Sequence, residues 1–202
     1  MSFEPINCKG CILGSSSVGK SCIAIRYINN NFENDVPSTL NALYYKKIIE
    51  TDRGLVQLNL WDTAGQEKYR ALGKHFYKDA FIICLIYDLT NRKTFEDIKN
   101  IWYPDLLKYG EEFTVIAIIG NKLDLCEENT TDVEAENYAK EIGAKFKLVS
   151  AKTGVGVDDI FIELVKAYVE PRFSIKIKDF NERKRGSFRC EKIQKKQKKN
   201  CC

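Results

Sequence analysis

Eight consecutive residues near the N-terminus, Gly14 to Ser21, combine glycines, hydroxyl residues and a lysine in an order that suits phosphate binding. They match the pattern G-x-x-x-x-G-K-[ST]. Glycines let the backbone approach a ligand closely, and exposed N–H groups at a helix N-terminus attract phosphate oxygens. We expect Lys20 to reach the β- and γ-phosphates of a nucleotide and the Ser21 hydroxyl to bind Mg²⁺. The alternative is a chance Gly/Ser turn before a helix.

A second group, Asp62, Gly65 and Gln66, follows an alternating apolar segment. A carboxylate at a strand end suits Mg²⁺, through a bridging water. The N–H of Gly65 can bond a γ-phosphate, and Gln66 can orient an attacking water. The alternatives are a helix N-cap for Asp62 and a solvated loop residue for Gln66.

Two short motifs at residues 121–124 and 150–152 suit recognition of a guanine base. Guanine presents two adjacent donors, N1 and the exocyclic N2, and the carboxylate of Asp124 can accept both. Adenine offers no such pair and would leave polar groups unpaired. We expect a backbone N–H in residues 150–152, that of Ala151, to donate to guanine O6. Each motif alone could be a turn, but their order behind the phosphate motif favours a nucleotide site.

Apolar periodicity predicts the elements that position these motifs. We expect strands at residues 7–13, 41–50, 55–61, 80–87, 113–119 and 146–149. We expect helices at residues 19–29, 92–108, 131–142 and 157–170, the second interrupted or kinked at Pro104. Residues 41–50 and 55–61 should form an antiparallel hairpin, and the remaining strand–helix alternation predicts a mostly parallel sheet with helices on both faces. The motifs then share the carboxyl edge of the sheet, where ligands bind.

The composition bounds the class of protein. Of 202 residues, 44% are hydrophobic and 30% charged, which is typical of a globular chain. The longest apolar run, residues 80–87, falls short of the about 20 residues that span a membrane, and no signal-peptide layout precedes it. We therefore expect a cytosolic protein whose eight cysteines are reduced. Their spacing matches no disulfide framework or zinc site, and the single histidine, His75, completes no catalytic triad.

Together these residues resemble the small GTPases, and more narrowly the Rab-type vesicle-traffic GTPases, over residues 6–170 and the last two residues. The Rab likeness rests on residues 61–70, 76–80 and 85–90 and on the terminal Cys201-Cys202. It implies an α/β P-loop GTPase fold with a six-stranded, mostly parallel sheet and one antiparallel edge strand. It also implies a switch that binds GTP or GDP with Mg²⁺ and hydrolyses GTP. No resident arginine finger is recognisable, so we expect slow turnover that an activating protein stimulates.

The resemblance also assigns site residues. Phe32 stands where the family stacks a ring on guanine, and Thr39 where a switch threonine binds magnesium and senses the γ-phosphate. The expected nucleotide-binding residues are Gly14, Ser15, Ser16, Ser17, Val18, Gly19, Lys20, Ser21, Cys22, Phe32, Thr39, Gly65, Asn121, Lys122, Asp124, Ser150, Ala151 and Lys152. The expected magnesium ligands are Ser21, Thr39 and Asp62, and the expected catalytic residues are Gln66 and Lys20.

Three positions depart from the family pattern. Asn41 replaces a common glycine in the first switch, which puts the usual effector surface in doubt. Ser16 stands where relatives often have glycine beside the γ-phosphate, so the fit of a catalytic partner can differ. Tyr44 replaces the usual phenylalanine, a mild change.

The chain divides into an expected G domain at residues 1–170 and a basic, disordered tail at residues 171–202. The tail carries 12 Lys and Arg against three Asp and Glu, whereas residues 1–170 carry 20 against 25. The resemblance implies that Cys201 and Cys202 are both prenylated, and two lipid chains anchor a protein stably. Five lysines between residues 192 and 199 would add attraction to anionic lipids. The alternative is a solvated tail with two idle thiols.

The implied partners are GTP and GDP, a membrane, protein effectors, an exchange factor, an activating protein and a GDP-dissociation inhibitor. We expect a monomer on the cytoplasmic face of an intracellular membrane that cycles with the cytosol. Nucleic acid is not expected, since no aromatic residues interleave the terminal lysines. Two rival functions share the phosphate loop: a nucleotide kinase, which leaves residues 121–124 unexplained, and a GTP-binding protein without turnover, which leaves Gln66 unexplained.

Overall fold

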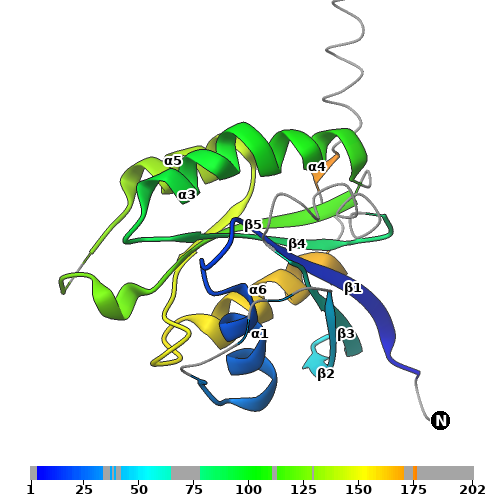
Figure 1. Ribbon diagram of the computed structural model, residues 1–202. Coiled ribbons are helices and arrows are strands. Elements are labelled where there is room, and N and C mark those ends of the chain that lie inside the picture. The colour runs from blue at the N-terminus through cyan, green and yellow to red at the C-terminus, as the bar shows by residue number, and fades with distance from the viewer. Residues whose placement is uncertain are drawn as a thin grey trace, which may run out of the picture.

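The computed structural model describes residues 4–33, 37, 39, 42–64, 78–110, 113–128, 130–170 and 175–176 (Figure 1). The strands are β1 (Ile6–Leu13), β2 (Leu43–Thr51), β3 (Gly54–Asp62), β4 (Ile82–Asp88), β5 (Phe113–Asn121), β6 (Lys145–Leu148) and β7 (Ile175–Lys176). The helices are α1 (Lys20–Asn29), α3 (Arg92–Asp97), α4 (Tyr103–Tyr109), α5 (Val133–Ile142) and α6 (Val157–Val169). A π-helical turn (Ile98–Trp102) joins α3 to α4, and a 3₁₀ turn (Leu123–Leu125) follows β5.

The main sheet has the strand order β2-β3-β1-β4-β5-β6. The edge strand β2 is antiparallel to β3, and the other neighbouring pairs along this order are parallel. This confirms the predicted six-stranded sheet with one antiparallel edge strand. In addition, β7 pairs antiparallel with the start of β5. Residues 175–176 of the expected disordered tail are therefore paired here, and the rest of the tail lies outside the described residues.

Helices cover both faces of the sheet. In Figure 1, α3, α4 and α5 lie on one face, and α1 and α6 lie on the other. One apolar cluster contains Ile23 of α1 and Phe161 of α6, and a second contains Phe95 of α3 and Leu106 of α4. Every residue of the central strand β4 is buried, which explains its unbroken apolar sequence.

The predicted helix at residues 92–108 is interrupted, but not by a kink at Pro104. The chain widens into the π-helical turn just before the proline, where the N–H of Tyr103 donates to the carbonyl of Ile98. Pro104 then lies in the first turn of α4, where a missing N–H leaves no helix hydrogen bond unmade. The wide turn thus gives the proline a position that it tolerates.

Five cysteines among the described residues, at positions 8, 11, 22, 84 and 126, are free thiols. None of the helices in this part of the chain is long and apolar enough to cross a bilayer.

Candidate functional site

The described motif residues meet at one edge of the sheet. The phosphate loop follows β1, Asp62 ends β3, Asn121 ends β5, and Ser150 comes just after β6. Since β1, β3, β5 and β6 run parallel within the sheet, their carboxyl ends share this edge. The sequence prediction of a common site is therefore supported by the topology.

Two glycines shape the phosphate loop between β1 and α1. Gly14 has φ +144°, and a Cβ there would collide with the backbone carbonyl of Ile86. Gly19 has φ +90°, and a Cβ there would collide with the side-chain nitrogen of Asn121. Any other residue at either position would force the loop away from β4 or from the end of β5.

Lys20 opens α1 and turns its side chain back into the loop. It is buried, and its Nζ donates to the carbonyl of Ser15 at 2.8 Å. Burial lowers the pKa of Lys20 to about 8, although the nearby carboxylate of Asp62 acts in the opposite direction. An ammonium has three donors, so the lysine can hold this carbonyl and also bind a phosphate, whose charge would favour the protonated form.

The three predicted magnesium ligands lie together. The Ser21 hydroxyl donates to Asp62 Oδ2 at 2.5 Å and lies 2.9 Å from the Thr39 hydroxyl. Asp62 is fully buried, and its Oδ1 has no hydrogen-bond partner among the described residues. Burial raises the pKa of Asp62, while the Ser21 hydrogen bond and the charge of Lys20 oppose this. A buried, unpaired carboxylate oxygen is costly, so this oxygen donor set fits a divalent cation.

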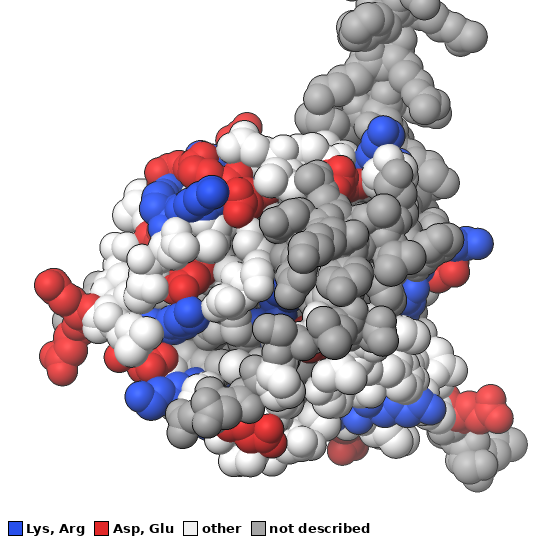
Figure 2. Space-filling view, in the orientation of Figure 1, with Lys and Arg blue, Asp and Glu red and all other residues white. Residues whose placement is uncertain are grey.

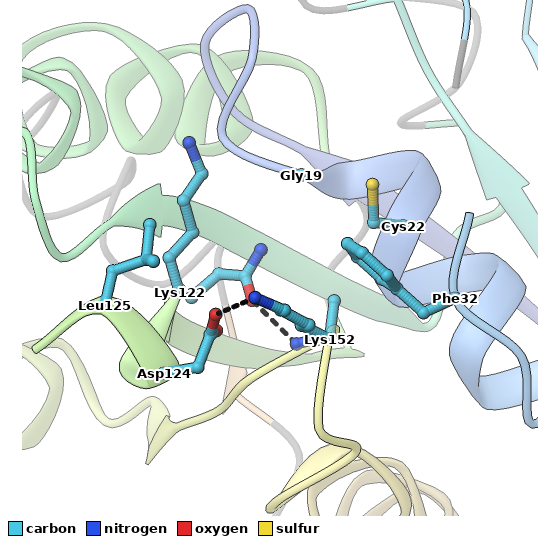
Figure 3. A pocket seen from close by; sticks show the side chains of 9 residues that line it. Gly19, Cys22, Phe32, Lys122, Asp124, Leu125 and Lys152 are labelled. Carbon is cyan, nitrogen blue, oxygen red and sulfur yellow. Dashed lines mark hydrogen bonds and ion pairs between the residues drawn. The ribbon is translucent and has the colours of Figure 1, made fainter. Parts of the chain in front are cut away.

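A pocket of about 240 Å³ lies beside the phosphate loop (Figure 3). It is lined by Gly19, Cys22, Phe32, Asn121, Lys122, Asp124, Leu125, Ala151 and Lys152. Figure 3 shows Phe32 and Cys22 across the pocket from Asp124 and Leu125. Apart from Leu125, all of these residues were predicted to bind the nucleotide, so the structure brings the expected base site together.

Asn121 joins the phosphate loop to residues 150–152, which follow β6 and form the base loop. Its amide nitrogen donates to the carbonyl of Val18 at 2.9 Å, and its Oδ1 accepts the N–H of Ala151 at 3.1 Å. The side chain is buried, with 2% of the residue's surface exposed. The Ala151 N–H, which we expected to face guanine O6, is thus held by Asn121 in this structure.

Asp124 is fixed at the pocket wall by the second base motif. Its Oδ1 accepts the Ser150 hydroxyl at 2.6 Å, and its Oδ2 lies 4.0 Å from Lys152 Nζ. The Ser150 oxygen in turn accepts the N–H of Thr153 at 3.1 Å. An ionised carboxylate offers about four lone-pair sites, so these contacts leave Asp124 able to accept two donors from a base.

Lys122 has a partner that sequence reasoning did not identify. Its Nζ lies 2.6 Å from Oδ2 of Asp88, the last residue of β4. Asp88 Oδ1 also accepts the N–H and the hydroxyl of Thr90. Burial favours a higher pKa for Asp88, but the hydrogen bonds from Lys122 and Thr90 outweigh it and hold the pKa below its usual value. The sequence does contain a signal for Asp88, because this carboxylate stands at the carboxyl end of an otherwise apolar strand.

Arg26 is a second residue that the sequence did not single out. Its guanidinium leaves α1 and donates to the carbonyl of Ala151 at 2.8 Å and to that of Lys152 at 2.6 Å. A further N–H donates to the carbonyl of Asn30 at 3.0 Å. The arginine therefore holds the base loop against α1. A lone arginine within a helix carries no sequence signal for this role.

Four of the predicted site residues lie outside the described residues. They are Gly65, Gln66, Cys201 and Cys202. Asn41 also lies outside them, so its effect stays a prediction. Tyr44 is described: its ring lies 5.0 Å from that of Trp61, and its hydroxyl donates to Asn59 Oδ1 at 2.6 Å. The tyrosine hydroxyl that distinguishes this chain from the family pattern is thus used.

We predict that Arg26→Ala weakens binding of GDP and GTP by about tenfold each, because the loop behind Ala151 loses two charge-assisted hydrogen bonds. Fluorescent-nucleotide titrations would measure both affinities. Arg53→Ala is the matched control, because Arg53 lies in the hairpin turn between β2 and β3, at the end of β2 away from the site. This variant should bind GDP and GTP as the parent does. Unchanged affinity in Arg26→Ala would show that the arginine does not support the base loop.

Comparisons with known proteins agree with this geometry. The Ras family model matches residues 9–170. The Ras-related protein Rab-21 of Homo sapiens is 37% identical over 163 residues, covering 80% of this chain and 72% of that protein. The Ras-related protein Rab-22A of Mus musculus is 36% identical over 157 residues, covering 77% and 80%. The Ras-related protein Rab-4 of Dictyostelium discoideum is 36% identical over 159 residues, covering 78% and 77%.

The family match spans most of the chain and includes the phosphate loop, the cluster around Asp62 and both base motifs. The order of the strands and the placement of the helices fit the Ras-like P-loop fold. The chain therefore belongs to the Ras family and is a small GTPase of the Rab type.

Proposed function

We propose that this protein is a guanine-nucleotide switch that regulates vesicle traffic, and that its GTP-bound form recruits effectors. The observation that carries the proposal is the contact of Ser21 with both Thr39 and Asp62, beside a buried lysine and next to the base pocket. It joins a residue of the first switch segment, Thr39, to the phosphate loop and to the end of β3. A change at the γ-phosphate can thereby reach a segment that a partner protein would contact.

Nucleotide selection rests on the base pocket. Asp124, oriented by Ser150, accepts the two donors on one edge of guanine, and Phe32 packs against the ring. Asn121 holds the phosphate loop and the base loop at a fixed separation, which suits a ligand that spans both. Lys122, which lines this pocket, is held by Asp88.

Hydrolysis of GTP depends on position and charge rather than on a covalent intermediate. Lys20 stabilises negative charge on the β- and γ-phosphates, together with backbone N–H groups of residues 14–19. Gln66 aligns the attacking water. Ser21, Thr39 and Asp62 would hold Mg²⁺, Asp62 through a water, and the ion would neutralise charge on the phosphate oxygens. Without a resident arginine the intrinsic rate is slow, and an arginine from an activating protein raises it by about 10³ to 10⁵.

Switching follows from the loss of the γ-phosphate. Thr39 and the N–H of Gly65 bind the γ-phosphate, so the two segments that carry these residues order around GTP and are released after hydrolysis. Effectors select the ordered form. An exchange factor, an activating protein and a GDP-dissociation inhibitor control the cycle of the monomer.

Membrane attachment rests on the C-terminal tail. Prenyl groups on Cys201 and Cys202, with the lysines of residues 192–199 beside anionic lipids, place residues 1–170 on the cytoplasmic face of an endomembrane or vesicle. The intact mass of the protein from its own cells should show two prenyl additions. An unmodified C-terminal peptide would contradict this anchor.

We predict that Gln66→Leu slows single-turnover hydrolysis of bound GTP by about tenfold or more, because the attacking water loses its orienting partner. GTP affinity should stay near that of the parent, since the glutamine acts on the water. Phosphate release from the preloaded protein with Mg²⁺ is the measurement, with ATP as the parallel substrate. Gln57→Leu is the control, because Gln57 bonds Asn7 and Asn59 on the sheet. Equal rates in Gln66→Leu and the parent would remove Gln66 from the mechanism.

A further inference from the structure

A polar cluster of Ser15, Asp97 and Trp102 lies where the π-helical turn meets the phosphate loop. The Ser15 hydroxyl donates to Asp97 Oδ2 at 2.7 Å and accepts the indole N–H of Trp102 at 3.4 Å. Ser15 is the second residue of the loop, and its partners are 82 and 87 positions away in the sequence. A helix on one face of the sheet thus reaches the loop that binds the phosphates.

The backbone of Ser15 connects this cluster to Lys20. The lysine Nζ donates to the Ser15 carbonyl at 2.8 Å, while the Ser15 hydroxyl is bonded to Asp97. One residue therefore holds the phosphate lysine with its main chain and is itself held by its side chain. A shift of Ser15 would move the atom that orients the ammonium.

The wide turn explains why Asp97 and Trp102 can share one hydroxyl. Residues five apart diverge by about 140° around an α-helix of 3.6 residues per turn. The π-helical turn Ile98–Trp102 has i→i+5 bonding, shown by Tyr103 N–H donating to the Ile98 carbonyl, and a wider turn reduces this divergence. Both side chains then face Ser15. Trp102 is buried.

We expect the conformation of the phosphate loop to depend on the hydrogen bond between Ser15 and Asp97. Between Ser15 and Gly19, the side chains of Ser16 and Ser17 are exposed, and Ser17 has φ +63°, a conformation that a non-glycine residue rarely adopts. A charged acceptor makes a stronger hydrogen bond than a neutral one, so the Asp97 bond is the stronger of the two at Ser15.

We propose that Asp97 is a positioning residue for the phosphate lysine and acts through Ser15. The carboxylate fixes the Ser15 carbonyl, and this carbonyl directs Lys20 toward the β- and γ-phosphates. The proposal rests on the proposed nucleotide site and adds a residue on α3 to it. Loss of this hydrogen-bond acceptor should weaken the binding of GDP and GTP and slow hydrolysis, because Lys20 contributes both to binding and to hydrolysis.

Neighbouring charges supply a matched control. Glu96, next to Asp97, pairs with Lys99, and Lys99 also pairs with Glu134 of α5. In Figure 2 acidic and basic side chains gather over α3 and α5. Glu96→Ala therefore removes a carboxylate from the same helix without touching Ser15.

The test compares Ser15→Ala, Asp97→Ala, Asp97→Asn, the double variant Ser15→Ala/Asp97→Ala and Glu96→Ala in the full chain. The release rate of bound labelled GDP and the single-turnover hydrolysis of bound GTP are measured. Asp97→Ala and Ser15→Ala should each release GDP about tenfold faster and hydrolyse GTP about tenfold more slowly. The double variant should match either single variant, because both changes break one chain of contacts.

Two variants separate positioning from general support of the fold. Asp97→Asn keeps an oxygen that accepts the Ser15 hydroxyl, so its rates of GDP release and GTP hydrolysis should lie close to those of the parent. Glu96→Ala should behave as the parent. Additive effects in the double variant, or parental rates in Asp97→Ala, would overturn the proposal. If Asp97→Ala does not fold, Ser15→Ala carries the same expectation, and parental rates there would overturn it equally. Failure of the parent to bind or hydrolyse GTP would instead refute the proposed function.

Discussion

The rest of the site depends on two hydrogen bonds made by the buried side chain of Asn121. Its two polar ends are both used, one on the carbonyl of Val18 and the other on the N–H of Ala151. A buried amide that lost either partner would be left with an unsatisfied polar group, so the two loops are held at one separation. Gly19 is required for the same reason, since a side chain there would displace the amide. A nucleotide that bridges both loops therefore meets a site that is already assembled.

The site contains two buried ionisable side chains, Lys20 and Asp62, whose charged forms a ligand would stabilise. Lys20 and Asp62 are buried close together, and burial lowers the pKa of the first while raising that of the second. One oxygen of Asp62 has no partner among the described residues. Phosphate oxygens and a divalent cation would supply the missing partners and favour the charged forms of both side chains. The same groups that are costly to bury without a ligand would then contribute to binding it.

Much of the fold and most of the described site residues could be predicted from the sequence. Each motif follows a strand, and parallel strands bring their carboxyl ends to one edge, so Lys20, Asp62 and Asp124 had to meet. The predictions were incomplete where a contact depends on side chains that look like ordinary helix residues. Arg26, Asp97 and Trp102 reach loops that are 82 to 126 positions away, and no local pattern encodes such distances. The position of Pro104 predicted an interruption of its helix. It did not predict that a π-helical turn would precede the proline, or that Asp97 would face the phosphate loop.

Recognition of guanine by Asp124 is tested most directly by competition. GTP and ATP, each with Mg²⁺, would displace a labelled guanine nucleotide from the purified parent protein and from Asp124→Ala. We expect the parent to bind GTP about 10⁴-fold more tightly than ATP, because adenine leaves the carboxylate without its two donors. In Asp124→Ala this preference should largely disappear. Equal displacement by GTP and ATP from the parent protein would contradict the assignment of the pocket and, with it, the function.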